Sequence, residues 1–169
     1  MALKLKQFAL KRAIFSACVA GIINLIIVYF ALRADGEVPL FASVAEIWNH
    51  SLIGALIPRS IFISFIITVT TMFATVKEVS NKSEELSLKL KKSSWIKIAL
   101  KKALIQALIA FTTVIVLAFI LRLLFPTYAE LSVSVVIPIV GIFAALVAFS
   151  MTYSAVFSTG KILNSGEQF

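Results

Sequence analysis

The chain has 169 residues, a net charge of +8, 60% hydrophobic residues and only 14% charged residues. A soluble domain usually has about 45–50% apolar and about 25% charged residues, so this composition argues against a soluble fold and favours several membrane spans. The single cysteine, Cys18, excludes a disulfide framework and a cysteine-based zinc site within one chain.

The first predicted span runs from about Ala13 to Leu32, between basic residues on both sides. Its length of about 20 residues suits a bilayer crossing, whereas the apolar core of a secretory signal has about 7–15 residues. No Ala-x-Ala cleavage site follows it, so we expect an uncleaved span.

The second predicted span lies at about 52–76, after a polar turn at 34–40 and a short interfacial helix at 41–49 that contains Trp48. Pro58 interrupts its apolar run. Either the helix begins near Ser51 and continues through the proline, or residues 52–57 form a partly re-entrant lead-in. We favour the kinked helix, because proline is tolerated in spanning helices.

A polar segment at 77–92 predicts a helical linker, followed by spans at about 98–124 and 132–157 with a short turn at 125–131. The predicted units are a first hairpin at 1–77, a basic linker at 78–97 and a second hairpin at 98–169. The predicted fold class is therefore all-α, a polytopic membrane protein with four transmembrane helices.

The two halves look like a tandem repeat. Residues 9–13 match residues 99–103, and Ile57-Pro58 matches Ile137-Pro138. Because each half holds two spans, the halves would have the same orientation, which is the parallel kind of repeat. The alternative is that basic-plus-apolar segments resemble one another through composition alone.

Orientation follows from the positive-inside rule. Of the 16 lysine and arginine residues, only Arg33, Arg59 and Arg122 fall on the side opposite to the termini. We therefore expect both termini and the middle linker to be cytoplasmic.

Polar residues inside the spans are the candidate lining of a solute path. Hydroxyl residues recur every three or four positions along the second span, so they share one helix face. The path candidates are Asn24, Arg59, Ser60, Ser64, Thr68 and Thr71. The alternative is helix packing, for which small residues such as Gly21 and Gly141 are also suited. No acidic residue falls within a span, which argues against an ion-coupled transporter.

Catalytic and metal-binding patterns are weak. Glu46 and His50 are four residues apart, but two ligands make a poor metal site. There is no glycine-rich phosphate loop and no Ser/His/Asp set, so we expect no enzyme activity, no metal and no cofactor.

The basic segments are amphipathic and suit the membrane surface. We expect contact with anionic lipid headgroups or a partner protein, and not with nucleic acid, through a set of lysines in the linker and third span. These are Lys89, Lys91, Lys92, Lys97, Lys101 and Lys102.

Residues 21–32, followed by Glu37-Val-Pro-Leu40, resemble the first hairpin of small, uncharacterised four-span membrane proteins of bacteria. The resemblance covers about a third of the chain. It implies a bacterial inner membrane but no particular activity.

The sequence leaves two functions open. The first is a small, oligomeric membrane channel or transporter that passes a small polar or anionic solute. The second is a non-enzymatic membrane subunit or scaffold that binds a partner protein or anionic lipid through its basic cytoplasmic face.

Overall fold

The structure is a computed structural model that describes residues 2–33, 36–41, 51–80, 92–125 and 130–165. Its elements are α1 (Ala2–Leu32), β1 (Glu37–Pro39), α2 (Leu52–Ser80), α4 (Lys92–Leu124), β2 (Glu130–Ser132) and α5 (Val133–Ser165). The four helices are long and apolar enough to cross a membrane, as the sequence predicted. The predicted interfacial helix at 41–49 and the middle of the linker lie outside the described residues.

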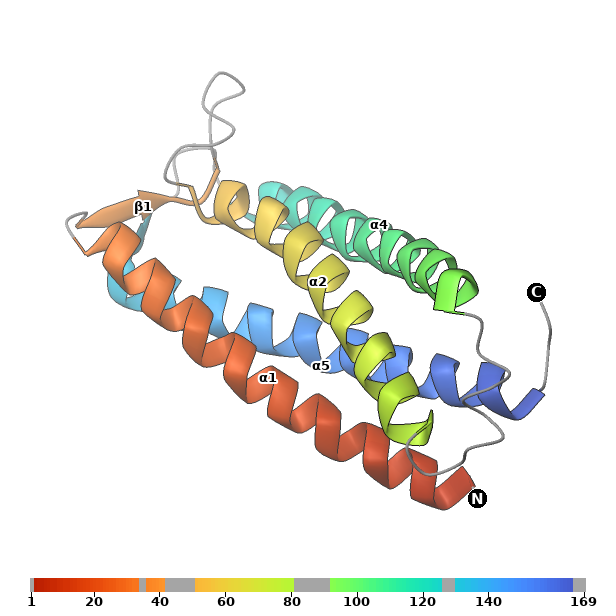
Figure 1. Ribbon diagram of the computed structural model, residues 1–169. Helices are drawn as coiled ribbons and strands as arrows, with labels where there is room; N and C mark the ends of the chain where they lie inside the picture. Colours follow the sequence, from red (N-terminus) through yellow and green to blue (C-terminus); the bar gives the residue numbers. More distant parts are fainter. Residues whose placement is uncertain (1, 34–35, 42–50, 81–91, 126–129, 166–169) are drawn as a thin grey trace.

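The helices form an elongated bundle in which α5 packs against both α1 and α2, and α2 packs in turn against α4 (Figure 1). Direct contact between α4 and α5 is slight. The principal contacts therefore run between the two halves of the chain rather than within each hairpin expected at 1–77 and 98–169.

The bundle has two distinct ends (Figure 1). The strand end carries β1 and β2. At the opposite end α1 and α4 begin and α2 and α5 finish, and we call this the basic end, because Lys6, Lys11, Lys77 and Lys97 lie there with exposed side chains.

Close packing of α1 on α5 depends on small residues. A Cβ atom added at Gly141 would lie 2.5 Å from both Cγ and Cδ2 of Leu25. A Cβ atom added at Gly21 would lie 3.2 Å from the Cβ of Ala145. The two glycines thus let the helix backbones approach, as small residues do between spanning helices.

The second helix is continuous from Leu52 through Pro58. Ser51 caps it, because its Oγ accepts a hydrogen bond from the backbone N–H of Gly54 at 3.0 Å. The alternative of a re-entrant lead-in at 52–57 is therefore wrong, since these residues are the first turns of α2.

At the strand end, β1 and β2 pair antiparallel, with Val38 opposite Leu131. The sequence predicted only irregular turns here. Each strand is three residues long, too short for a periodic signal, and the pairing joins residues far apart in sequence. Val38 is buried beneath the pair and belongs to the apolar core of this end.

Apolar side chains fill both ends of the bundle. Near the strand end, ten buried residues that include Val28, Leu56 and Val136 form one cluster. Near the basic end, Met72, Trp95, Ala99 and Ala155 form a smaller one. Between these clusters lie small and polar residues, and this middle layer holds the candidate site.

Candidate polar site within the helix bundle

The hydroxyl face of α2 points into the bundle. Ser60, Ser64, Thr68 and Thr75 are at most 1% exposed, and Thr71 is half-buried. Two of these hydroxyls are satisfied by their own helix: Ser60 Oγ donates to the carbonyl of Ile57 at 2.7 Å, and Thr75 Oγ1 donates to that of Thr71 at 2.8 Å. These four side chains are thus closed off from the surface of the bundle in this conformation.

Three helices meet through Gln106. Thr68 on α2 donates its hydroxyl proton to Oε1 of Gln106 on α4. The Gln106 Nε2 donates in turn to Oγ of Ser154 on α5, at 2.7 Å. Gln106 is 7% exposed and lies near the middle of α4. The amide thus connects three helices at a depth where a bilayer offers no water to polar groups.

One turn from Thr68, Ser64 is fully buried and its Oγ has no hydrogen-bond partner; the same holds for Thr152 Oγ1 on α5. A buried hydroxyl without a partner costs about 1–3 kcal/mol. Ser64 and Thr152 are therefore buried polar groups whose hydrogen-bonding capacity is unused among the described residues.

Asn24 and Arg59, the other path candidates, do not join this cluster through hydrogen bonds. The Asn24 amide is buried and donates to the carbonyl of Ala20 at 2.9 Å, within its own helix. The Arg59 guanidinium donates to the carbonyl of Ala55 at 2.8 Å, so the side chain reaches back along α2 toward the strand end.

Sequence reasoning named Thr68 but left Gln106 and Ser154 out of the proposed path. Two signals in the sequence pointed to them: the amide of Gln106 inside the third span, and the four-residue spacing of Ser150, Ser154 and Ser158 in the fourth. Neither pattern connects these residues to α2, and their meeting follows from the packing of three helices.

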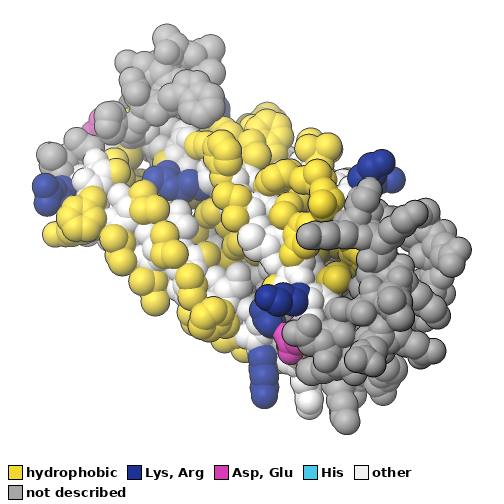
Figure 2. Space-filling view, viewed as in Figure 1, with side chains coloured by type: hydrophobic (Ala, Val, Ile, Leu, Met, Phe, Trp, Pro, Cys, Tyr) yellow, Lys and Arg dark blue, Asp and Glu magenta, His cyan; other side chains and the backbone are white. Residues whose placement is uncertain are grey.

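Of the lysines expected to contact lipid or a partner, Lys92, Lys97, Lys101 and Lys102 lie in the first turns of α4. Lys97 and Lys101 are exposed and Lys102 is half-buried, whereas the side chains of Lys89, Lys91 and Lys92 are outside the described residues. Nearby, Arg12 of α1 forms a 2.6 Å salt bridge with Glu78 of α2. Figure 2 shows Lys and Arg side chains near this end of the molecule and an apolar surface along the helices.

Two carboxylates lie close together at the strand end. Glu37 and Glu130 stand on the paired strands, offset by two positions. A hydrogen bond with Glu37 and repulsion from its charge raise the pKa of Glu130 above its ordinary value. The pair is exposed and lies outside the helices.

Among the described residues no group of three or more potential metal ligands comes together. Glu46 and His50 are outside those residues, and Cys18 is exposed on α1. Comparisons with protein families, curated proteins and solved structures found no match to this chain. Four apolar helices are compatible with an integral membrane protein.

Proposed function

We propose that this chain is a small integral membrane transporter or channel for a small, neutral polar solute. The observation that carries the proposal is the hydrogen-bonded cluster of Thr68, Gln106 and Ser154, of which Thr68 and Gln106 are buried and Ser154 is exposed, with the unpartnered hydroxyl of Ser64 one turn away. Polar groups at this depth are costly in a bilayer unless they pair or serve a function.

The chemistry of the cluster favours a neutral solute. Hydroxyl and amide groups both donate and accept hydrogen bonds, but they carry no charge to balance an ion. Among the path candidates the one cation is Arg59, which reaches toward the strand end and would act at the mouth of the path. Passage requires α2 to move relative to α5, because Ser64 and Thr68 are closed off in this conformation.

Flux into proteoliposomes tests the proposal, with urea and glycerol as neutral probes and nitrate as an anion. We expect Ser64→Ala together with Thr68→Val to lower neutral-probe flux to that of empty liposomes. Thr70→Val is the matched control, because Thr70 is exposed on the same helix and its hydroxyl donates to the carbonyl of Ile66. Wild-type flux equal to that of empty liposomes, or equal loss in the control, would refute the proposal.

The proposed setting is a bacterial inner membrane, with the basic end at the cytoplasmic side. The support is the charge asymmetry, since the exposed lysines of the described residues gather at the basic end. A homo-oligomer is part of the same proposal and is tested by native mass spectrometry of the extracted protein with its lipids retained.

We also propose that the two halves are a parallel repeat, related by a pseudo-two-fold axis between α2 and α5. Such an axis exchanges α1 with α4 and α2 with α5, so the contact of α1 with α5 corresponds to that of α4 with α2. Burial supports this correspondence at six pairs of positions in α2 and α5: Leu56 and Val136, Ser60 and Val140, Ser64 and Ala144, Thr68 and Ala148, Met72 and Thr152, Thr75 and Ala155.

The strand pair fits the same axis, because Val38 and Leu131 follow Glu37 and Glu130 and lie opposite one another. Since the main contacts run between the halves, we expect co-expressed halves split within 81–91 to co-purify as a complex. Two halves that remain separate would count against this architecture.

A further inference from the structure

Four residues of α4 form a stripe that meets α5 at Gln106. Lys102, Gln106, Ile109 and Thr113 are spaced by four, three and four positions, so they lie on one helix face. On α5, Ser150, Ser154 and Ser158 are spaced by four and also share a face. The Gln106–Ser154 hydrogen bond brings the two stripes together.

The two stripes flank the seam between α4 and α5, which otherwise make little direct contact. Ser150, Ser154, Ile109 and Thr113 are exposed, and Lys102 is half-buried. On the basic side of the Gln106 bond the flanking residues are therefore a lysine and a serine hydroxyl. Neither helix contains an aspartate or glutamate that would neutralise Lys102 from beside this seam.

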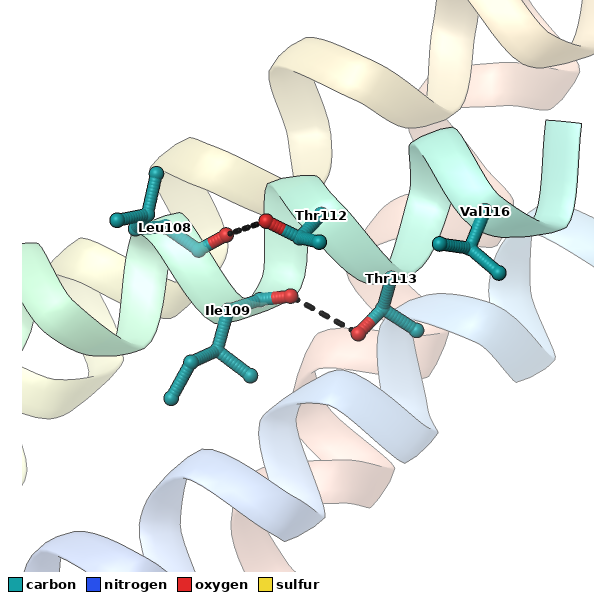
Figure 3. Close-up of a pocket in the computed structure, with 5 residues that line it drawn as sticks. All are labelled: Leu108, Ile109, Thr112, Thr113 and Val116. Carbon is teal, nitrogen blue, oxygen red and sulfur yellow. Dashed lines mark hydrogen bonds between the residues drawn. The ribbon is translucent and has the colours of Figure 1, made fainter. Parts of the chain in front are cut away.

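Toward the strand end the α4 stripe leads into a shallow hollow of about 420 Å³. Its lining is Leu108, Ile109, Thr112, Thr113 and Val116, on successive turns of α4 (Figure 3). The two threonine hydroxyls donate to the carbonyls of Leu108 and Ile109, at 2.9 Å each. With their protons engaged in this way, they leave the hollow with a largely apolar surface.

We propose that the α4–α5 seam at the Gln106–Ser154 bond, together with the hollow on α4, binds an anionic glycerophospholipid of the leaflet at the basic end. The Lys102 ammonium binds the phosphate. The Ser154 hydroxyl, which accepts from Gln106 and retains a proton to donate, binds a glycerol ester carbonyl. An acyl chain lies in the hollow.

The spacing along α4 matches this order of groups. Lys102 precedes Gln106 by about 6 Å of helix rise, comparable with the distance from phosphate to ester in a phospholipid. The hollow begins within the next turn, deeper in the bilayer. Basic pockets between spanning helices on the cytoplasmic side are typical sites for anionic lipid headgroups. The inference requires only a chain embedded in a bilayer with its basic end at an anionic leaflet, and does not depend on the proposed transport.

Native mass spectrometry of the full chain in detergent tests the preference for an anionic headgroup. The protein is titrated with phosphatidylglycerol or with phosphatidylcholine of identical acyl chains. We expect a preference for phosphatidylglycerol that Lys102→Gln lowers about fivefold, the effect of one lysine at an anionic surface. Lys11→Gln is the matched control, because Lys11 is an exposed lysine at the same end of the bundle on α1, which does not pack against α4. Equal effects of the two substitutions, whether loss or no change, would overturn the site.

Two further measurements test the position of the acyl chain and distinguish a bound lipid from a free anion. Val116→Phe, which fills the hollow, should weaken both lipids, whereas Ile115→Phe, at an exposed neighbour outside the hollow, should not. Equal retention in these two variants would overturn the acyl-chain assignment. Displacement of phosphatidylglycerol by millimolar inorganic phosphate would identify an anion site and overturn a lipid site.

Discussion

Gly141→Ala is the sharpest test of how α1 and α5 pack. The added methyl group would lie 2.5 Å from Cγ and Cδ2 of Leu25 and 3.3 Å from its Cδ1. Carbon atoms in contact are normally about 3.5–4.0 Å apart, so two atoms would overlap by about 1 Å. Leu25 would have to leave its position, and the two helices would separate locally.

The size of the effect follows from two opposing terms. Overpacking of this kind costs about 1–3 kcal/mol. Replacing a helical glycine by alanine returns about 1 kcal/mol of helix propensity. Gly21→Ala receives the same propensity gain, but its methyl group meets Ala145 at 3.2 Å and needs a shift of only a few tenths of an ångström. We therefore expect Gly141→Ala to be less stable than Gly21→Ala by about 1–2 kcal/mol.

The assay is reversible unfolding of the purified protein in mixed micelles as the fraction of sodium dodecyl sulfate rises, followed by circular dichroism. A second substitution, Leu25→Ala, removes the atoms that collide, so the cost of Gly141→Ala should fall by about 1 kcal/mol or more in that background. If Gly141→Ala were as stable as Gly21→Ala, or if Leu25→Ala left its cost unchanged, the close approach of α1 and α5 would be refuted.

Three further outcomes are expected. A double-mutant cycle of Gln106→Leu and Thr68→Val should give a coupling of about 0.6 kcal/mol and at most about 1.7 kcal/mol, and additive effects would contradict their hydrogen bond. The pKa of Glu130 is raised in the folded protein, so protonation of its carboxyl group stabilises the fold. This stabilisation is complete below the ordinary glutamate pKa, and it is lost as the pH rises through the raised pKa of the folded protein. The variants Glu130→Gln and Glu37→Gln should therefore have the same thermal stability as the wild type at acidic pH, and a higher one at pH values above the raised pKa of Glu130. Parallel pH profiles of thermal unfolding for the wild type and both variants would contradict the carboxylate pair. Reporters that are active only in the cytoplasm should work when fused to either terminus, and an inactive fusion would contradict the proposed orientation.

The four helices could be predicted from the sequence because each apolar run is long enough to span a bilayer, and that signal is local. The continuation of α2 through Pro58 could also be argued locally, from the tolerance of spanning helices for proline. The inward hydroxyl face of α2 was visible as a spacing, since Ser60, Ser64 and Thr68 recur at helical intervals.

Which of these elements pack against one another could not be predicted from the sequence in the same way. Whether α1 packs on α2 or on α5 depends on the fit of Gly21 and Gly141 across two distant segments, and apolar faces that lipid also covers do not select a neighbour. The same holds for the strands, whose three-residue pairing joins the two loops only once the helices are placed. Gln106 was visible as a polar residue in an apolar span. Its connection to Thr68 and Ser154 exists only in the tertiary structure, because a side-chain hydrogen bond depends on the distance between helices and not on their sequences alone.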